Sequence, residues 1–379
     1  MIVFDNIIFS LQRAGGISAM WQNVLSEADK LGVEYCTLEY PQAGENIFRR
    51  ALSLRSGSAE QRTFRMSKTI EQMLDVPFRQ MHLPFIFHSS YYRTCSHPKA
   101  LNITTVHDFI YERRISHVGL AERIRIKLNH RAIRRSRQII CVSENTRRDL
   151  LHFLPDIDPK KVSVIYNGVS DEFHPLLDKI SELSDCILFV GGRQDYKNFG
   201  FAIQVAKATE LKLLICGNEL TDKEKSLLES ELGADGYSFS LRPDNKMLNR
   251  FYNSVRCLIY PSEYEGFGIP IIEAQKAGCP VIALNASSVP EIIDTQGKYP
   301  MLASANINSA IDLIDRFGEQ EYREEIVARG LKNATRFSWR FAGLQYALLY
   351  SNLLHPEPQE KSAKSQFVGT HPRCIRCIR

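Results

Sequence analysis

The sequence predicts an α/β protein built from two doubly wound, Rossmann-like domains. Three observations carry this prediction. The chain has 379 residues, which is too long for one typical core and fits two domains of ordinary size. Short β-forming runs alternate with helical stretches, the pattern of parallel sheets with crossover helices. These runs fall into two groups, separated by a polar stretch at residues 169–184 that contains Pro175.

Each group supplies the strands of one expected sheet. We expect a first domain over residues 1–172 and a second over residues 173–338. Residues 42–80 fit no strong period and predict an insertion or a helical hairpin on the first domain. The expected strands are residues 1–4, 35–38, 85–89, 103–107, 138–143 and 162–166 in the first domain, and 186–191, 212–216, 237–241, 256–260 and 280–284 in the second.

A packed helix and a polar segment follow the second domain. Apolar residues recur at helical spacing over residues 340–354, so residues 339–354 are expected to form a helix that packs on the protein. Residues 355–379 are rich in Pro, Glu, Lys and Ser and then become basic, which predicts a mobile tail.

Composition indicates a cytoplasmic globular protein. Hydrophobic residues make up 44% and charged residues 24% of the chain, and no apolar run approaches the roughly 20 residues of a membrane span. The start, Met1-Ile-Val-Phe-Asp5, looks like a strand rather than a signal peptide. Nine cysteines occur mostly singly, many inside apolar runs, as expected of reduced core thiols. The net charge of +5 is mild and does not favour a nucleic-acid partner.

The segment Glu265-Gly-Phe-Gly-Ile-Pro-Ile-Ile-Glu273 carries the clearest functional signal. A buried strand precedes it, Gly266 and Gly268 permit a tight turn, and Pro270 suits the first position of a helix. The free N–H groups of Gly268, Ile269 and Ile271 would then form an anion site at the helix start. Glu265 and Glu273 would offer acceptors on either side of that anion, suited to the hydroxyls of a sugar or a ribose.

This segment, followed by Ala277-Gly-Cys-Pro-Val-Ile-Ala283 and Ser287-Ser-Val-Pro-Glu-Ile292, resembles the retaining family-four glycosyltransferases of the GT-B fold. The resemblance implies two Rossmann-like domains facing each other across a cleft, with the last helix crossing back onto the first domain. It implies that Glu273 accepts from the donor's ribose, that Glu265 accepts from its sugar, and that Phe267, Gly268 and Ile269 line the donor site.

A second donor element follows the first strand of the second domain, in Phe189-Val-Gly-Gly-Arg-Gln-Asp-Tyr-Lys-Asn198. Arg193 and Lys197 fall in the loop at the carboxyl end of that strand, where open α/β sheets bind ligands, and two cations there suit a diphosphate. By resemblance they hold the donor's phosphates and stabilise the leaving nucleotide. The backbone near Leu241 and Arg242 is a weaker candidate for contacting the base.

Four features of the first domain are expected to face the donor or the acceptor. Gly15-Gly16 opens a helix and permits close backbone approach. His107, at the end of an expected strand, matches the family's active-site histidine, and Asp108 would orient it or cap the next element. His88 lies at the end of another strand, and its surroundings suggest acceptor contacts. Ser143 is expected to cap a helix at the wall of the cleft.

Two further patterns concern the membrane and metals. The Arg123–Arg137 stretch is basic and amphipathic, which favours equally an anionic membrane surface and a solvated helix covering the sheet. The Asp156-Ile-Asp158 motif could suggest a divalent metal, but its position between Pro155 and Pro159 indicates a surface turn. We therefore expect no metal and no cofactor.

The resemblance implies a metal-independent, retaining hexosyltransferase, and the family members it resembles favour a mannosyl unit from GDP-mannose as the donor. The acceptor would be a saccharide or lipid-linked saccharide in cell-surface polysaccharide synthesis, at the inner face of the cytoplasmic membrane. UDP- and dTDP-sugars remain alternative donors. A sugar-nucleotide epimerase, a catalytically silent subunit of the same fold and a nucleic-acid binder are the alternatives of other classes.

Overall fold

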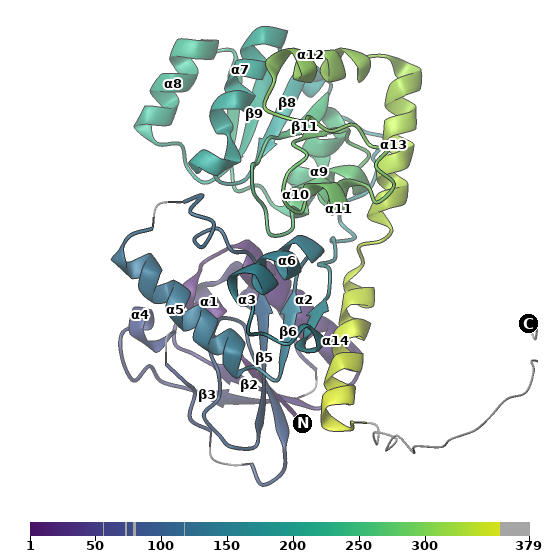
Figure 1. Cartoon of the computed structure of the whole chain (residues 1–379). Helices are drawn as coiled ribbons and strands as arrows, with labels where there is room; N and C mark the ends of the chain where they lie inside the picture. Colours follow the sequence, from purple (N-terminus) through teal and green to yellow (C-terminus); the bar gives the residue numbers. More distant parts are fainter. Residues whose placement is uncertain (56, 73, 79–80, 117, 357–379) are drawn as a thin grey trace, which may run out of the picture.

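The computed structural model contains two α/β domains, one above the other in Figure 1, each built on a single parallel sheet. The structure describes residues 1–55, 57–72, 74–78, 81–116 and 118–356. The expected tail therefore lies almost entirely outside the described residues. The two-domain architecture predicted from the sequence is confirmed.

The first domain holds a seven-stranded sheet in the order β3-β2-β1-β4-β5-β6-β7, with every pair of neighbours parallel. Its strand order turns at β1 and β4, as in doubly wound folds. The strands are β1 Ile2–Asp5, β2 Tyr35–Glu39, β3 Ser58–Gln61, β4 Phe85–Ser89, β5 Ala100–Val106, β6 Gln138–Cys141 and β7 Val162–Val164. The helices are α1 Ile8–Leu11, α2 Gly16–Lys30, α3 Ile47–Ala51, α4 Lys68–Glu71, α5 Leu120–Arg135 and α6 Glu144–Phe153, with 3-10 turns at Ala43–Glu45 and Pro159–Lys161.

The edge strand β3 is the element that the sequence did not predict. The region 42–80 was expected to be an insertion or a helical hairpin, but part of it extends the sheet, with Ser58 paired to Cys36 of β2. The strand is largely exposed and polar, so it lacks the apolar alternation that marks a half-buried strand. The two helices of this region are short and separate.

The second domain holds a five-stranded parallel sheet in the order β10-β9-β8-β11-β12. The strands are β8 Cys186–Val190, β9 Lys212–Gly217, β10 Tyr237–Leu241, β11 Cys257–Tyr260 and β12 Val281–Ala283. The helices are α7 Phe199–Thr209, α8 Asp222–Leu232, α9 Asn245–Ser254, α10 Ile269–Lys276, α11 Val289–Ile293, α12 Ile307–Arg316 and α13 Gln320–Ala334, with 3-10 turns at Ser181–Leu183 and Asp195–Lys197.

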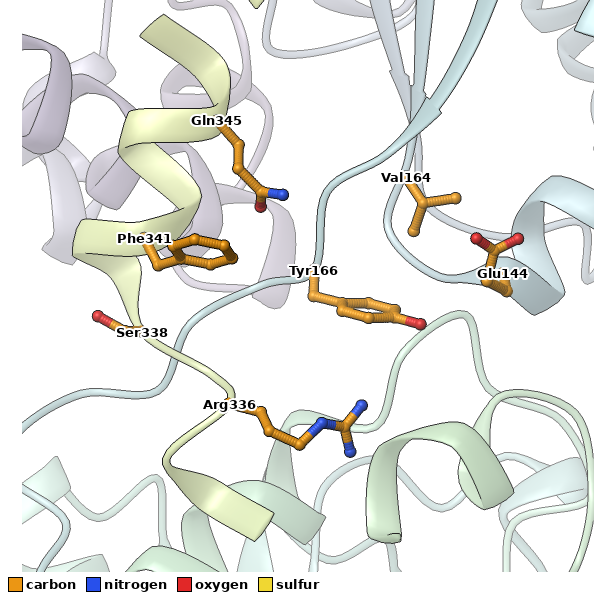
Figure 2. A pocket seen from close by; sticks show the side chains of 7 residues that line it. All are labelled: Glu144, Val164, Tyr166, Arg336, Ser338, Phe341 and Gln345. Carbon is orange, nitrogen blue, oxygen red and sulfur yellow. The ribbon is translucent and has the colours of Figure 1, made fainter. Parts of the chain in front are cut away.

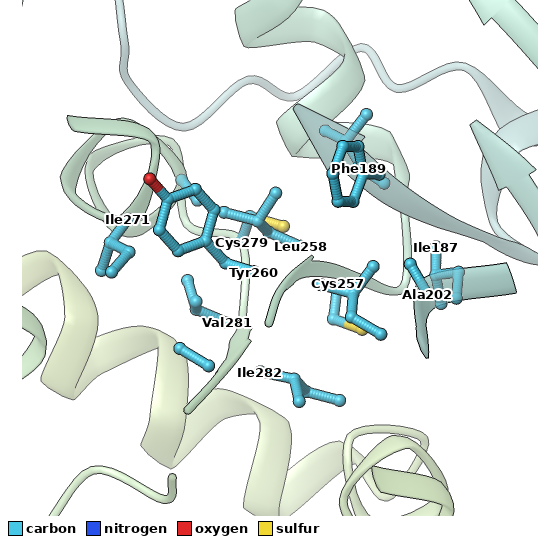
Figure 3. Packing of buried hydrophobic residues seen from close by; sticks show 14 of the residues in the cluster. Ile187, Phe189, Ala202, Cys257, Leu258, Tyr260, Ile271, Cys279, Val281 and Ile282 are labelled. Carbon is cyan, nitrogen blue, oxygen red and sulfur yellow. The ribbon is translucent and has the colours of Figure 1, made fainter. Parts of the chain in front are cut away.

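The core of the second domain lies on both faces of its sheet. Cys257 and Leu258, neighbours on β11 whose side chains point to opposite faces, and Ile282 of β12 are fully buried (Figure 3). Such strands appear in the sequence as continuous apolar runs rather than alternating ones. Seven cysteines of the described residues are free and buried, in agreement with the expected core thiols.

The helix α14, Trp339–Leu354, packs beside α2 of the first domain, as the resemblance implied (Figure 1). Gly343 lies so close to Glu27 that a Cβ there would come within 2.4 Å of the Glu27 side chain. The helix α14, which follows the second domain in the sequence, thus completes the first domain.

The segment between the domains is also held in place, because the His174 and Leu176 amides donate to the side chains of Asn249 and Asn253 of α9.

Candidate functional site

The carboxyl ends of the strands of both sheets meet between the domains. The loop after β5 carries His107, and the loop after β11 carries Gly266, from opposite domains. They are in direct contact, since a Cβ on Gly266 would lie 1.9 Å from the carbonyl oxygen of His107. In open α/β sheets this edge is where ligands bind. The predicted donor and acceptor elements therefore face one another.

Glu265 and Lys197 form an ion pair at this edge. The Lys197 Nζ donates to the Glu265 carboxylate at 2.5 Å and lies over the rings of Tyr196 and Tyr260. The Glu265 amide donates to the Ser287 hydroxyl at 2.8 Å, which fixes the backbone on the other side. Lys197 and Glu265, both predicted to contact the donor, thus form an ion pair although they are 68 positions apart in the sequence. Two tyrosine rings pack against the ammonium group of this pair.

Arg193 has one side engaged by protein and one side without a partner. Its Nε and Nη2 donate to the Glu224 carboxylate at 2.7 and 3.3 Å, and Nη2 also donates to the Glu219 carbonyl at 2.8 Å. Its Nη1 is buried and has no partner among the described residues. A buried donor without an acceptor is costly, so Nη1 is suited to an anion in this loop. Glu224 itself was not predicted, although Thr221 and Glu224 form a recognisable capping box.

The turn before α10 forms the expected anion-binding end of a helix, with two corrections. Gly268 caps α10 with φ +102°, a conformation that favours glycine. The helix begins at Ile269, so Pro270 is its second residue and not its first. The Ile271 amide donates to the Gly268 carbonyl and is not free. Among the described residues, the amides of Gly268 and Ile269 donate to no protein acceptor, and these two remain for a ligand.

Glu273 lies one turn further along α10, mostly buried. The Tyr252 hydroxyl donates to its carboxylate at 3.1 Å. Burial raises the pKa of Glu273 from 4.5 to about 7, and the Tyr252 hydrogen bond only partly opposes that rise. Ribose hydroxyls donating to this carboxylate would offset the cost of its charge, because hydrogen bonds to the ionised form favour that form.

We expect Glu273→Gln to stabilise the ligand-free protein at pH 8 but not at pH 4.5. The folded pKa lies above the unfolded one, so the carboxyl costs no stability below about pH 4.5, and the cost builds up between pH 4.5 and about 7 and is complete above that range. Glutamine stays neutral throughout, and the gain in the free energy of unfolding at pH 8 should be on the order of 3 kcal/mol. Thermal unfolding of both proteins at the two pH values measures it. Equal differences at both pH values would contradict the assigned cause.

His107 and Asp108 lie at the edge of the first domain, beside the Gly266 loop of the second. Burial lowers the pKa of His107 to about 4, so its imidazole is neutral near pH 7. Asp108 is exposed at the surface, but nearby protein desolvates its carboxyl and, with Glu112 and Glu265, raises its pKa to about 6. The Asp108 carboxylate accepts from the Ile110 amide, so it caps the following turn. A Cβ on Gly266 would lie 3.1 Å from the Asp108 Cβ, so Asp108 lies next to the loop that carries Glu265.

Two predicted residues lie in the interior, away from the cleft. His88 is fully buried, with one ring nitrogen 2.7 Å from the Tyr350 hydroxyl and the other 2.9 Å from the Thr105 hydroxyl. This leaves no surface for the predicted acceptor contact. The Phe267 side chain is 5% exposed and packs near Tyr166 and Phe337, so its predicted donor contact is limited to its backbone.

Gly15 and Gly16 open α2 as expected, and they differ in surroundings. A Cβ on Gly15 would meet the Gln12 Oε1 at 2.3 Å, whereas a Cβ on Gly16 would meet nothing within 4 Å. Gly16 is therefore open to solvent, whereas Gly15 is only partly exposed. In the second domain, Leu241 is exposed at the end of β10, and the Arg242 amide donates to the Gly217 carbonyl next to the Arg193 loop.

Ser143 and the Asp156-Ile-Asp158 motif have defined structural roles. The Ser143 hydroxyl accepts from the Thr146 amide and caps α6, as predicted. It also donates to the Gly266 carbonyl of the second domain at 2.6 Å. Asp156 pairs with Arg134, and Asp158 caps the 3-10 turn that follows it. Both carboxylates are thus engaged in the expected surface turn.

Comparisons with known proteins agree with this architecture. Residues 14–173 match the family described as Glycosyltransferase Family 4, and residues 178–335 match Glycosyl transferases group 1. The chain is 40% identical over 90 residues to O-antigen chain mannosyltransferase B of Escherichia coli, covering 23% of each protein. It is 28% identical over 200 residues to O-antigen chain mannosyltransferase RfbU of Salmonella typhimurium, covering 49% of this chain and 55% of that protein.

The matched segments thus span about a quarter and about half of those two relatives' lengths. Among solved structures, Anabaena Alr3699/HepE in complex with UDP and glucose is similar to this chain with a TM-score of 0.70. The two are 13% identical in sequence, and the superposition covers 93% of this chain and 99% of that one. This likeness shows the shared fold.

Proposed function

The chain belongs to the family-four glycosyltransferases of the GT-B fold, and from that premise we propose that it transfers a hexosyl unit from a nucleotide-diphosphate sugar to a saccharide or lipid-linked saccharide. The transfer would retain the anomeric configuration and need no metal. The favoured donor is GDP-mannose and the favoured setting is cell-surface polysaccharide synthesis, because two relatives are O-antigen chain mannosyltransferases. The peripheral, cytoplasmic-side location follows from that setting.

The observation that carries the proposal is a set of unpartnered donors at one sheet edge. The buried Nη1 of Arg193 and the amides of Gly268 and Ile269 have no protein acceptor among the described residues. Lys197 lies at the same edge. The Arg193 guanidinium, the Lys197 ammonium group and the N-terminus of α10 together suit the two phosphates of a nucleotide-diphosphate sugar. Glu273 would then accept from the ribose.

These residues also suit the departure of the nucleotide. Negative charge grows on the leaving diphosphate as the sugar bond breaks, and fixed donors aimed at that charge lower the barrier. Lys197 would turn from Glu265 toward the phosphate, which frees the Glu265 carboxylate to accept from sugar hydroxyls. A neutral His107 can donate a hydrogen bond to the sugar without adding charge at the anomeric carbon. The leaving phosphate would help to deprotonate the acceptor on the same face.

A thermal-shift panel of GDP-, UDP-, dTDP- and ADP-sugars tests the donor site, followed by product analysis with lipid-linked saccharides. We expect one base to raise the melting temperature most and Glu273→Ala to reduce that rise. A panel in which no nucleotide sugar changes the melting temperature would rule out the donor site. A response to UDP- or dTDP-sugars alone would replace GDP-mannose as donor. Conversion of the donor without acceptor would favour an epimerase, and binding without any turnover a silent subunit.

We also propose that the start of α5 contacts an anionic membrane. Leu120, Arg123, Ile124 and Lys127 share one helix face, with Leu120 77% and Ile124 44% exposed. Arg123 and Lys127 form no ion pair with the described residues. Further along the helix, Arg131 and Arg135 pair with Asp75. The second half of α5, whose cations are paired, is typical of a helix on a protein surface. The first half, with unpaired cations beside exposed apolar residues, is typical of a helix that binds lipid. No helix in the described part of the chain meets the length and hydropathy of a membrane span.

Removing both cations, in Arg123→Ser/Lys127→Ser, should weaken binding to vesicles of anionic phospholipid. Each cation near such a surface contributes about 1 kcal/mol, so the loss should be roughly 30-fold in the partition coefficient. Co-sedimentation with phosphatidylglycerol vesicles measures it. Arg134→Ser, which removes a cation already paired with Asp156, is the control and should change binding little. Equal losses in both variants would count against a specific face.

A further inference from the structure

Glu265 lies in the loop between β11 and α10 of the second domain. The residues on both sides of Glu265 in this loop are hydrogen-bonded to the first domain. On one side, the Tyr264 hydroxyl donates to the Asp149 carboxylate at 2.7 Å. On the other, the Ser143 hydroxyl donates to the Gly266 carbonyl at 2.6 Å. Asp149 and Ser143 belong to α6 and its cap. The position of Glu265 between these two anchors therefore depends on a helix of the other domain.

A third contact holds the start of α6 to the second domain. The Glu291 carboxylate accepts from the Glu144 amide at 2.9 Å and from the Asn145 amide at 2.8 Å. It also accepts from the Tyr166 hydroxyl at 2.8 Å. Figure 2 shows the Tyr166 ring between Glu144 and Arg336, in the lining of a cavity of about 230 Å³. Three donors from the first domain thus converge on one carboxylate of the second.

We propose that α6 positions Glu265 for sugar transfer and that Glu291 is the positioning residue that latches α6 to the second domain. The first amides of a helix have no partner within the helix, and a carboxylate at that end is favoured by the helix dipole. Hydrogen bonds to a charged acceptor are about twice as strong as neutral ones. The inference rests on the proposed function, since it explains how Glu265 is held where it would contact the donor's sugar.

The latch has consequences for turnover that differ from those for donor affinity. The phosphate and ribose contacts proposed above, from Arg193, Lys197 and Glu273, all come from the second domain. Loss of the Glu291 contact should therefore leave donor binding intact. It should, however, change the position of Glu265 relative to His107 of the other domain. Small misplacements of reacting groups cost up to about 100-fold in rate, so the effect belongs in kcat.

Residue-resolved hydrogen exchange tests the latch without any substrate. The Glu144 and Asn145 amides should be protected in the wild-type protein and exchange fast in Glu291→Ala. The Thr146 amide should stay protected in both, because it donates to Ser143 within its own domain at 3.0 Å. Continued protection of the first two amides in the variant would refute the contact. Tyr166→Phe, which removes only one donor to Glu291, should loosen them partly and guards against a variant that does not fold.

Kinetics then test positioning. For Glu291→Gln and Glu291→Ala we expect kcat to fall about 10- to 100-fold, least for glutamine, which keeps one acceptor oxygen. Donor affinity should stay within about twofold, as misplacement affects the reaction rather than binding. Glu325→Gln, at an exposed pair with Arg329, is the matched control. Wild-type kcat in Glu291→Ala with fast-exchanging amides would refute positioning. If the wild-type protein transferred no sugar, the proposed function would be wrong. The exchange data would still test the Glu291 contact with α6.

Discussion

Gly266→Ala should abolish most sugar transfer while leaving the nucleotide site intact. The added Cβ would lie 1.9 Å from the His107 carbonyl oxygen and 3.1 Å from the Asp108 side chain, so the two domains could not close. A misalignment of that size across a reaction centre costs about 100-fold or more in kcat/KM. Steady-state transfer assays measure the loss, and small-angle scattering should show a larger radius of gyration.

The matched control is Gly200→Ala in α7 of the second domain. A Cβ there meets nothing within 4 Å, and alanine favours a helix over glycine by at most about 1 kcal/mol, the value for a helix interior, whereas Gly200 is the second residue of α7. This variant should be as active as the wild type and at least as stable. If Gly266→Ala retained wild-type transfer, the closed arrangement of the two domains would not be the reactive one.

Lys197→Ala should cause the second large loss, in turnover. Its ammonium group is the nearest cation to Glu265, at 2.5 Å, and it is proposed to meet the charge on the departing diphosphate. Removal of one such donor costs about 10²- to 10³-fold in kcat. The measurement is kcat at saturating donor and acceptor, with melting temperature as a check on folding.

Lys207→Ala is the control for a lost lysine in the same domain. Lys207 lies on α7 with 59% of its side chain exposed and pairs with Glu231. Such surface pairs contribute about 0–1 kcal/mol, so activity and stability should barely change. A Lys197→Ala protein with a lower melting temperature and unchanged kcat would show that the pair with Glu265 is only structural.

Much of the second domain's side of the cleft could be predicted because its determinants are local. A strand, a glycine turn and a helix start lie within one short segment around Gly268, so their relation in space follows from backbone geometry. The ion pair between Lys197 and Glu265 could not be predicted, since it requires the order of strands β8 and β11. The sequence indicates those strands but not their adjacency.

The first domain was harder to predict because its neighbours come from distant parts of the chain. His88 follows the pattern of a site residue at the end of a strand. Its role is decided by Tyr350 of α14, 262 positions away, which covers it. Gly266 was expected to serve a tight turn, whereas the closest restriction on it is the His107 carbonyl of the other domain. Neither partner can be identified from local pattern.

The place of α14 has a consequence for how the protein forms during synthesis. The first domain needs residues 339–354, because Tyr346 and Tyr350 are buried in its core beside Phe4 and Trp21. The core of the second domain ends earlier along the chain, with Phe337, before α14 begins. Folding on the ribosome should therefore run against chain order, with the second domain maturing first and the first domain waiting for α14. Until that helix emerges, the apolar surface that it covers stays open to chaperones.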